Sequence, residues 1–181
     1  NYTWYGVGGK ADFVILPRTV DELADVVKRC SENGIPLKVI GQGSNLLISD
    51  EGVKGAVIKL GGDDFTKPRF DEETLYAPAG ANLSKLVLEC VRMGLGGLEA
   101  LTGIPGSVGG AIRMNAGGKF GDIGASVESV MLMDSSGRVF EKSKPQLVFD
   151  YRSTNITAKV ILEAKIQLVE ADSDQLLKTT K

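Results

Sequence analysis

The chain has 181 residues, of which 24% are charged, and a formal net charge of -2. This length can bury one good core, and the charge balance gives no sign of a surface that binds nucleic acid or anionic lipid. Histidine is absent, which excludes Ser-His triads and zinc sites with histidine ligands. No apolar run is long enough to cross a bilayer. Cys30 and Cys90 fall on apolar helix stripes and are expected to be buried free thiols, which fits a reducing cytoplasm.

The first third of the chain predicts extended, helical and extended segments in turn. Residues 2–15 read as extended, with a turn at Gly8 and Gly9. Thr19 to Glu22 has the pattern of a capping box, in which Glu22 reaches back to the start of the helix. Apolar residues then recur at helical spacing until Gly34: Val20, Leu23, Val26, Val27 and Cys30. Strands are predicted over residues 37–40 and 56–60.

The remaining segments complete a mixed α+β pattern. Residues 63–73 are polar and predict a surface loop, followed by a strand over 74–77. Asn82 is a helix cap for residues 83–91, and Gly94 ends that helix. Period-two alternation predicts a hairpin over 127–140 with its turn at 134–137, and a strand over 159–169. A helix start is predicted at 172–177.

Two glycine-rich loops are the most informative part of the chain. Gly41 to Asn45 follows the strand at 37–40, and Gly103 to Gly117 holds several glycines and a proline among apolar residues. Glycine loses more backbone entropy on folding than any other residue, so such runs indicate that the backbone approaches a ligand closely. Two loops of this kind in one small chain indicate an extended ligand with phosphate groups, held at two points.

Neither loop matches a common phosphate motif. Gly41 to Asn45 resembles the opening of a dinucleotide fingerprint, but Leu46 stands where the third glycine belongs. A P-loop is excluded because no glycine is followed by Lys and Ser or Thr at the required spacing. Taken alone, Gly41 to Asn45 could be a tight turn. Ser107 could cap a helix or a turn, or it could contact the ligand, and the sequence leaves these interpretations open.

Several motifs in order along the chain resemble the UDP-N-acetylenolpyruvoylglucosamine reductase family. The matching segments are Val39 to Asp50, Gly97 to Gly110, Met114 to Gly117, Gly121 to Gly124, Thr3 to Asp12 and Phe149 to Ser153. Lys10 is a minor departure, since the family often has proline there. The resemblance runs nearly from end to end of the chain.

The resemblance implies an α+β fold, a two-lobed FAD-binding domain of the vanillyl-alcohol-oxidase/PCMH type. It implies FAD-binding subdomains over residues 1–60 and 61–170. Residues 171–181 would begin a linker or helix that leads to a substrate domain absent from this chain. Both ends of the chain look trimmed, because it begins at Asn1 and stops soon after a helix start.

The resemblance also implies that FAD lies between the lobes with its diphosphate against the two loops. Attachment would be non-covalent, since a bond to histidine is impossible here. Ser44, Asn45 and Ser107 would add side-chain hydrogen bonds. The implied cofactor-binding residues are Ile40, Gly41, Gln42, Gly43, Ser44, Asn45, Leu46, Gly103, Ile104, Pro105, Gly106, Ser107, Gly109, Gly110, Asn115, Ala116 and Gly117.

The chemistry that the resemblance implies is NADPH-dependent reduction of the enolpyruvyl ether of UDP-N-acetylglucosamine, a cytoplasmic step of peptidoglycan synthesis in cell wall biogenesis. The partner is a UDP-sugar substrate, with neither nucleic acid nor membrane involved. Arg152 would stabilise the negative charge of the enolate, and Tyr151 would hold Arg152 or pack under the flavin. The proton donor of the family lies downstream of Lys181.

Two other functions stay open at this point. One is an FAD-binding subunit of a related oxidoreductase that acts on another substrate. The other is a flavin-binding module without catalytic activity.

Overall fold

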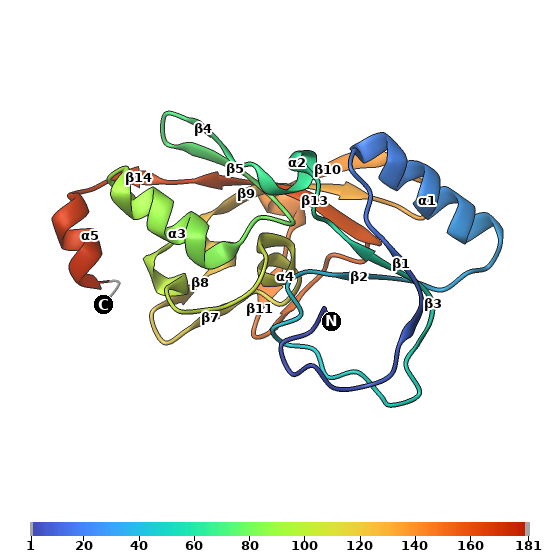
Figure 1. Cartoon of the computed structure of the whole chain (residues 1–181). Helices are drawn as coiled ribbons and strands as arrows, with labels where there is room; N and C mark the ends of the chain where they lie inside the picture. Colours follow the sequence, from blue (N-terminus) through green and yellow to red (C-terminus); the bar gives the residue numbers. More distant parts are fainter. Residues whose placement is uncertain (1, 180–181) are drawn as a thin grey trace.

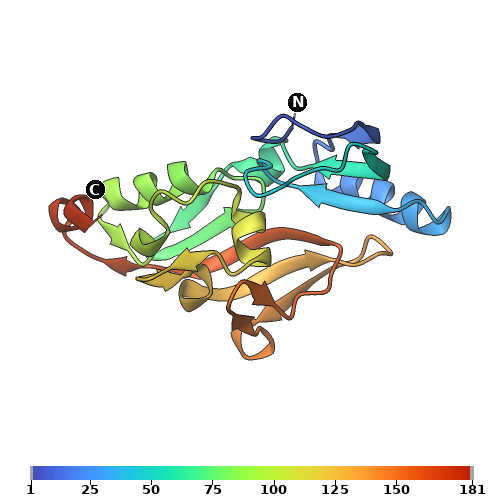
Figure 2. The same ribbon diagram turned by 90° about the horizontal axis from the view of Figure 1, so that it is seen from below.

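Two β-sheets organise the chain, one from residues 11–59 and one from residues 69–167 (Figure 1). The computed structural model describes residues 2–179. Seen from below, the first sheet and its helix form a lobe beside the larger second sheet (Figure 2). The structure therefore has the mixed α+β composition expected from the sequence.

The first sheet is parallel and has β3 (Val53–Lys59) between β1 (Ala11–Ile15) and β2 (Leu37–Ile40). Helix α1 (Val20–Glu32) connects β1 to β2 and buries Leu23, Val27 and Cys30. Of the extended segment predicted over residues 2–15, only β1 is a strand. The helix and β2 are confirmed with their predicted residues, and β3 begins three residues before the predicted position.

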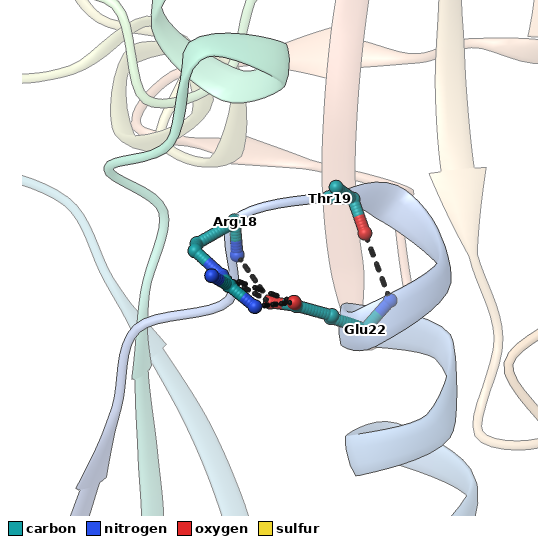
Figure 3. A network of polar contacts seen from close by, with 3 residues as sticks. All are labelled: Arg18, Thr19 and Glu22. Atoms are coloured by element: carbon teal, nitrogen blue, oxygen red, sulfur yellow. Dashed lines mark hydrogen bonds and ion pairs between the residues drawn. The ribbon is translucent and has the colours of Figure 1, made fainter.

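The start of α1 corrects one detail of the predicted capping box (Figure 3). The Thr19 hydroxyl accepts a hydrogen bond from the Glu22 amide at 3.2 Å, as expected. The Glu22 carboxylate, however, accepts from the backbone amide of Arg18 at 2.9 Å and from its guanidinium at 2.6 Å. The reciprocal half of the predicted box is therefore wrong, because Arg18 offers Glu22 a charged donor in addition to an amide.

The second sheet is antiparallel, in the order β10-β9-β13-β5-β4. Its strands are β4 (Arg69–Asp71), β5 (Thr74–Pro78), β9 (Val127–Met133), β10 (Val139–Ser143) and β13 (Val160–Gln167). Helix α3 (Leu83–Arg92) packs on it, and the Asn82 side chain accepts from the Lys85 amide as a cap. The predicted hairpin, the strand after residue 159 and this helix are confirmed.

The surface loop predicted over residues 63–73 is wrong. This segment contains the short helix α2 (Asp63–Thr66) and the edge strand β4. Phe65 is 1% exposed and belongs to the core. One apolar anchor among polar residues is enough to fix a helical turn here, since a buried phenylalanine contributes about 1.5–3 kcal/mol.

Shorter elements surround the second glycine loop and the end of the chain. They are β6 (Leu95–Gly96), η1 (Glu99–Leu101), α4 (Val108–Arg113), β7 (Gly117–Gly118), β8 (Gly121–Asp122), η2 (Ile123–Ser126), η3 (Lys144–Gln146), β11 (Phe149–Asp150), β12 (Ser153–Thr154), β14 (Val169–Glu170) and α5 (Ser173–Thr179). The predicted helix start near residue 172 is confirmed by α5. Helix α4 lies inside the glycine-rich segment and was not predicted.

One hydrophobic cluster joins the two sheets. It contains Leu23 and Ile58 from the first sheet region together with Leu132 and Ile166 from the second. Both cysteines are buried free thiols, as expected, and burial raises the pKa of Cys90 to about 12. Within residues 2–179 no helix is long and apolar enough to cross a membrane.

Candidate functional site: a cavity where the two glycine loops meet

The first glycine loop leaves the end of β2 and lies directly against the second. A Cβ on Gly41 would overlap the Ser107 side chain, so only glycine permits this approach. Ser44 Oγ donates to the Pro105 carbonyl at 3.1 Å. The Asn45 amide nitrogen lies 3.3 Å from the Met114 sulfur. Three residues of the first loop thus contact the second loop, although the loops are distant in sequence.

The second loop is held by the segment that follows strand β5 and by its own helix. The Gly109 amide donates to the Ala79 carbonyl at 2.8 Å, and the Val108 amide donates to the Ala81 carbonyl at 3.0 Å. Ser107 is the N-cap of α4, and its hydroxyl accepts from the Gly110 amide at 3.4 Å. The first turn of α4 therefore has protein partners for its amides.

A cavity of about 440 Å³ lies between the loops. This volume is within the range of roughly 300–1,000 Å³ that small-molecule sites occupy. The wall takes in both loops and the beginnings and ends of neighbouring strands. Its residues are Val39, Ile40, Gly41, Gln42, Gly43, Ser44, Asn45, Leu46, Leu60, Ala79, Gly80, Ile104, Pro105, Gly106, Ser107, Gly109, Gly110, Ala111, Arg113, Met114, Ala116, Arg152, Lys159 and Ile161.

The charges around this cavity are all positive. Arg113, Arg152 and Lys159 contribute to its wall, and no aspartate or glutamate does so among the described residues. Burial lowers the pKa of Arg113, but a guanidinium stays charged at neutral pH. The cavity therefore favours an anionic ligand.

Several backbone amides at the cavity are available to such a ligand. Within residues 2–179, the amides of Gly43, Ser44, Asn45 and Gly106 donate to no protein acceptor. A Cβ on Gly110 would meet only Ser107 Oγ, at 3.4 Å, so the space beside Gly110 is open. Free amides in a glycine loop are the donors that phosphate oxygens accept from.

Arg152 lies in the turn of the β11–β12 hairpin. Its φ is 56°, in the left-handed region that residues other than glycine seldom adopt. Its guanidinium lies 5.8 Å from the centre of the Tyr151 ring. An uncommon backbone conformation beside a cavity is a reason to suspect a functional role.

Tyr151 is 85% exposed and does not line the cavity. Of the two roles left open for it, contact with Arg152 agrees with this position. Its backbone amide donates to the Asp150 carboxylate at 2.6 Å, which tightens the same turn.

Most of the site residues expected from the sequence lie in the cavity wall. Gly103, Asn115 and Gly117 do not. Asn115 is 5% exposed, with its amide group bonded to the protein. A Cβ on Gly117 would overlap Asp122, its partner across β7 and β8. These two residues have structural reasons for their type.

The sequence analysis missed Arg113 and Lys159. Arg113 carried a usable signal, since it is the one cation inside the apolar and glycine-rich segment from 103 to 117. Lys159 lies directly before β13 and carried no such signal, because a lysine before a strand is ordinary.

Comparisons with known proteins agree with this geometry. A family model described as "FAD binding domain" matches residues 11–143. UDP-N-acetylenolpyruvoylglucosamine reductase of Clostridioides difficile strain 630 is 40% identical over 174 residues, which are 95% of this chain and 57% of that protein. The Clostridium tetani enzyme of the same name is 36% identical over 97% of this chain. The chain thus spans little more than half the length of the curated relatives that it matches.

Solved structures give the same picture at the level of the fold. The crystal structure of UDP-N-acetylenolpyruvylglucosamine reductase from Thermus caldophilus matches with a TM-score of 0.86 and 37% identity, covering 99% of this chain and 63% of that one. A berberine-bridge-enzyme-like protein of Arabidopsis thaliana matches with a TM-score of 0.69 at 22% identity, covering 93% of this chain and 36% of that one. The second likeness shows the shared two-lobed fold alone.

Proposed function

The chain belongs to the FAD binding domain family, and from this premise we propose that its cavity binds FAD non-covalently as part of a reductase. The observation that carries the proposal is the meeting of two glycine loops at one cavity, with free amides and with no carboxylate from residues 2–179 in its wall. These features suit a dinucleotide with two phosphate groups, because backbone amides and nearby cations can offset its charge.

The proposed cofactor residues are those of the two loops that line the cavity: Ile40 to Leu46, Ile104 to Ser107, Gly109, Gly110 and Ala116. We propose residues 1–60 and 61–170 as the two subdomains and residues after 170 as the lead into a further part. The division at residue 60 is supported by the end of β3 at Lys59.

The reaction that fits best is reduction of UDP-N-acetylglucosamine enolpyruvate to UDP-N-acetylmuramate with NADPH, a cytoplasmic step of peptidoglycan synthesis. The support is the 36–40% identity to reductases of that name over nearly the whole chain. FAD, when bound, supplies the hydride-transfer chemistry that no amino acid side chain can perform. UDP-sugar and NADPH are the partners that this proposal requires.

The role proposed for Arg152 follows from charge. Reduction of an enolpyruvyl group places negative charge on its carboxylate as the transition state develops. A guanidinium offers two parallel hydrogen bonds to such a planar anion and stays charged at neutral pH. Arg152 lines the cavity wall, which supports this role.

FAD binding is tested by Gly110→Ala with Gly118→Ala as its matched control. Neither glycine has a positive φ, and a Cβ at Gly118 meets nothing within 4 Å. In Gly110→Ala the added methyl enters the cavity, so the FAD dissociation constant should rise about tenfold, or about 1.4 kcal/mol. Stability should rise slightly, because alanine favours a helix over glycine by up to about 1 kcal/mol.

The measurement is a spectroscopic titration of the apoprotein with FAD, followed by acid precipitation of the complex. Gly118→Ala should bind as the parent does, and the acid supernatant should contain the flavin. No affinity for FAD, or equal affinity in both variants, would contradict the proposed site.

The reaction is tested with the Arg152→Ala substitution. The substitution is made in a fusion of this chain to the part of a full-length relative that lies beyond the matched region. Turnover of the enolpyruvyl substrate should fall on the order of a hundredfold, as for the loss of one oxyanion partner. The NADPH-dependent half-reaction should change much less than turnover, since no enolate forms in it. Rapid-mixing kinetics separates the two. A protein that binds flavin and does not oxidise NADPH would instead favour a binding module.

A further inference from the structure

The end of helix α4 holds the segment that carries Arg152. Arg113 donates from Nη1 to the Ile156 carbonyl and from Nη2 to the Ala158 carbonyl, the latter at 2.8 Å. Asn115 Nδ2 donates to the Asp150 carbonyl at 3.1 Å. One short stretch, residues 113–115, thus contacts residues 150–158 on both sides of Arg152.

Asn115 is fully committed to this contact. Its Oδ1 accepts from the Gly124 amide at 3.1 Å, so both ends of its amide group have protein partners. It is 5% exposed and has a φ of 43°, which asparagine tolerates better than most residues. Its side chain therefore connects η2 to the β11–β12 hairpin, and both of its polar atoms have protein partners.

Burial of a charged side chain makes arginine an energetically unfavourable choice at position 113 unless it has partners. It is half-buried, and burial lowers its pKa, yet its neighbours in α4 are glycine, alanine and isoleucine. A buried charge without partners is strongly unfavourable, and here the partners are two backbone carbonyls. The same helix places Gly109 and Gly110 in the cavity wall. Arg113 therefore joins the glycine loop to the segment of Arg152 and Lys159 through one rigid helix.

We propose that Arg113 and Asn115 are positioning residues that fix Arg152 relative to the glycine loops. The assignment rests on the function proposed above for Arg152. Without their side-chain hydrogen bonds, the hairpin is held mainly by Phe149, which packs beside Gly124, and by the chain on either side of it. The turn that carries Arg152 then samples positions away from the cavity.

The first test measures the hairpin itself in the FAD-loaded chain. Hydrogen exchange is followed in peptides that cover residues 148–158, where the Asn155 amide is bonded to the Val148 carbonyl. Arg113→Met should speed this exchange at least tenfold. Arg138→Met is the matched control, because Arg138 pairs with Asp134 in an exposed turn and should leave the exchange unchanged.

Two conservative variants keep the test decisive if Arg113→Met fails to fold. Arg113→Lys retains a charge and can reach one carbonyl, so exchange should rise about threefold. Asn115→Gly keeps the left-handed backbone and removes both amide contacts, so it should also speed exchange at 148–158. Unchanged exchange in Arg113→Lys and Asn115→Gly would overturn the proposal.

The second test asks whether Arg113 acts on the cavity through Arg152. A cation near the flavin favours its reduced form, so Arg152→Ala should lower the midpoint potential of the bound cofactor. Arg113→Met should lower the potential in the same direction. The double variant should go no lower than Arg152→Ala alone, because the two residues act as one unit.

The outcomes separate this proposal from the one on which it rests. An unchanged potential in Arg152→Ala would overturn the placement of Arg152 beside the flavin, whatever Arg113 does. A shift in Arg152→Ala together with no shift in Arg113→Met would overturn the positioning role alone. Additive shifts in the double variant would also overturn it, since they would make Arg113 an independent charge at the cavity.

Discussion

The two glycine loops look alike in sequence, yet their glycines answer different physical demands. In the first loop, Gly41 makes room for Ser107, and Gly43 has a φ of 69° beneath the backbone of Tyr2 and Thr3. In the second loop, Gly109 packs against Ala79 within a helix, whereas Gly110 borders open space. The first loop needs glycine because another chain segment lies close to its backbone. In the second loop, one glycine is needed for packing and another leaves space open to the cavity.

This difference shows that the glycines of a glycine-rich segment can be required for different physical reasons. Substitution of a glycine required by packing should change the stability of the fold. Substitution of a glycine beside an open cavity should change the affinity for the ligand. The sequence reading assigned all of them to the ligand. Substitutions can separate the two classes, because each class changes a different measurable quantity.

The largest effect is expected for Gly109→Val. A Cβ there would lie 2.8 Å from the Ala79 Cβ and 3.1 Å from its carbonyl oxygen. Such overpacking, in a helix bonded to that carbonyl, should lower the free energy of unfolding by about 3 kcal/mol. Urea denaturation of the apoprotein measures it, with Gly118→Val as the control. Full stability with weakened FAD binding would show that Gly109 belongs with the ligand glycines after all.

A smaller loss is expected for Gly41→Ala, and it should be repairable. The new methyl would overlap the Ser107 hydroxyl, so stability should fall by about 2 kcal/mol. Ser107→Gly removes the obstructing atoms and, as an N-cap exchange, costs only a few tenths of a kcal/mol by itself. The double variant should therefore be more stable than Gly41→Ala alone. Strict additivity of the two losses would contradict the close approach of the loops.

Ser44→Ala tests the polar contact between the loops. Loss of the hydrogen bond to the Pro105 carbonyl should cost about 1 kcal/mol of stability and weaken FAD binding about threefold. Ser84→Ala is the matched control, because Ser84 also donates to a loop carbonyl, that of Ile104, but from helix α3. Calorimetric titration with FAD should show a smaller change in Ser84→Ala. Equal changes would mean that joining the loops has no special effect.

The smallest effect lies outside both loops, in the turn after β9. A hydrogen bond from the Ser136 side chain, with amides of the same turn, lowers the pKa of Asp134 from 3.8 to about 2. Its contribution to stability is present above pH 3.8 and is lost as the pH falls towards 2, because the unfolded state then binds a proton more readily. Asp134→Asn should flatten the acid limb of a stability profile and leave FAD binding unchanged. An unaltered acid limb would argue against this turn.

The helix caps and the alternating strands were predictable because they depend on neighbours in sequence. Thr19 and Asn82 both cap helices as expected, and the hairpin of β9 and β10 has its predicted turn. Helix α2 was missed because its stability comes from one buried side chain, Phe65, in a distant core. Helix α4 was missed because glycine propensity argues against a helix and tertiary packing overrides it.

The location of the cavity was accessible from sequence, but the partners of its residues were not. Ser44 and Asn45 were expected to bind the ligand, and their side chains contact the opposite loop. Arg113 reaches carbonyls more than forty residues away, which no local pattern encodes. Contacts between distant segments decide whether a polar residue serves the ligand or the fold.

The strand order of the second sheet has a consequence for how the chain acquires its structure during synthesis. Strand β13 lies at the centre of that sheet, between β9 and β5, although it follows both in the chain. The first sheet and α1 can assemble early from nearby segments, while β5 must wait until residues 163–167 leave the ribosome. Long-range pairing of this kind slows folding and leaves strand edges open meanwhile. The second sheet of the nascent chain therefore stays unclosed until β13 has been synthesised.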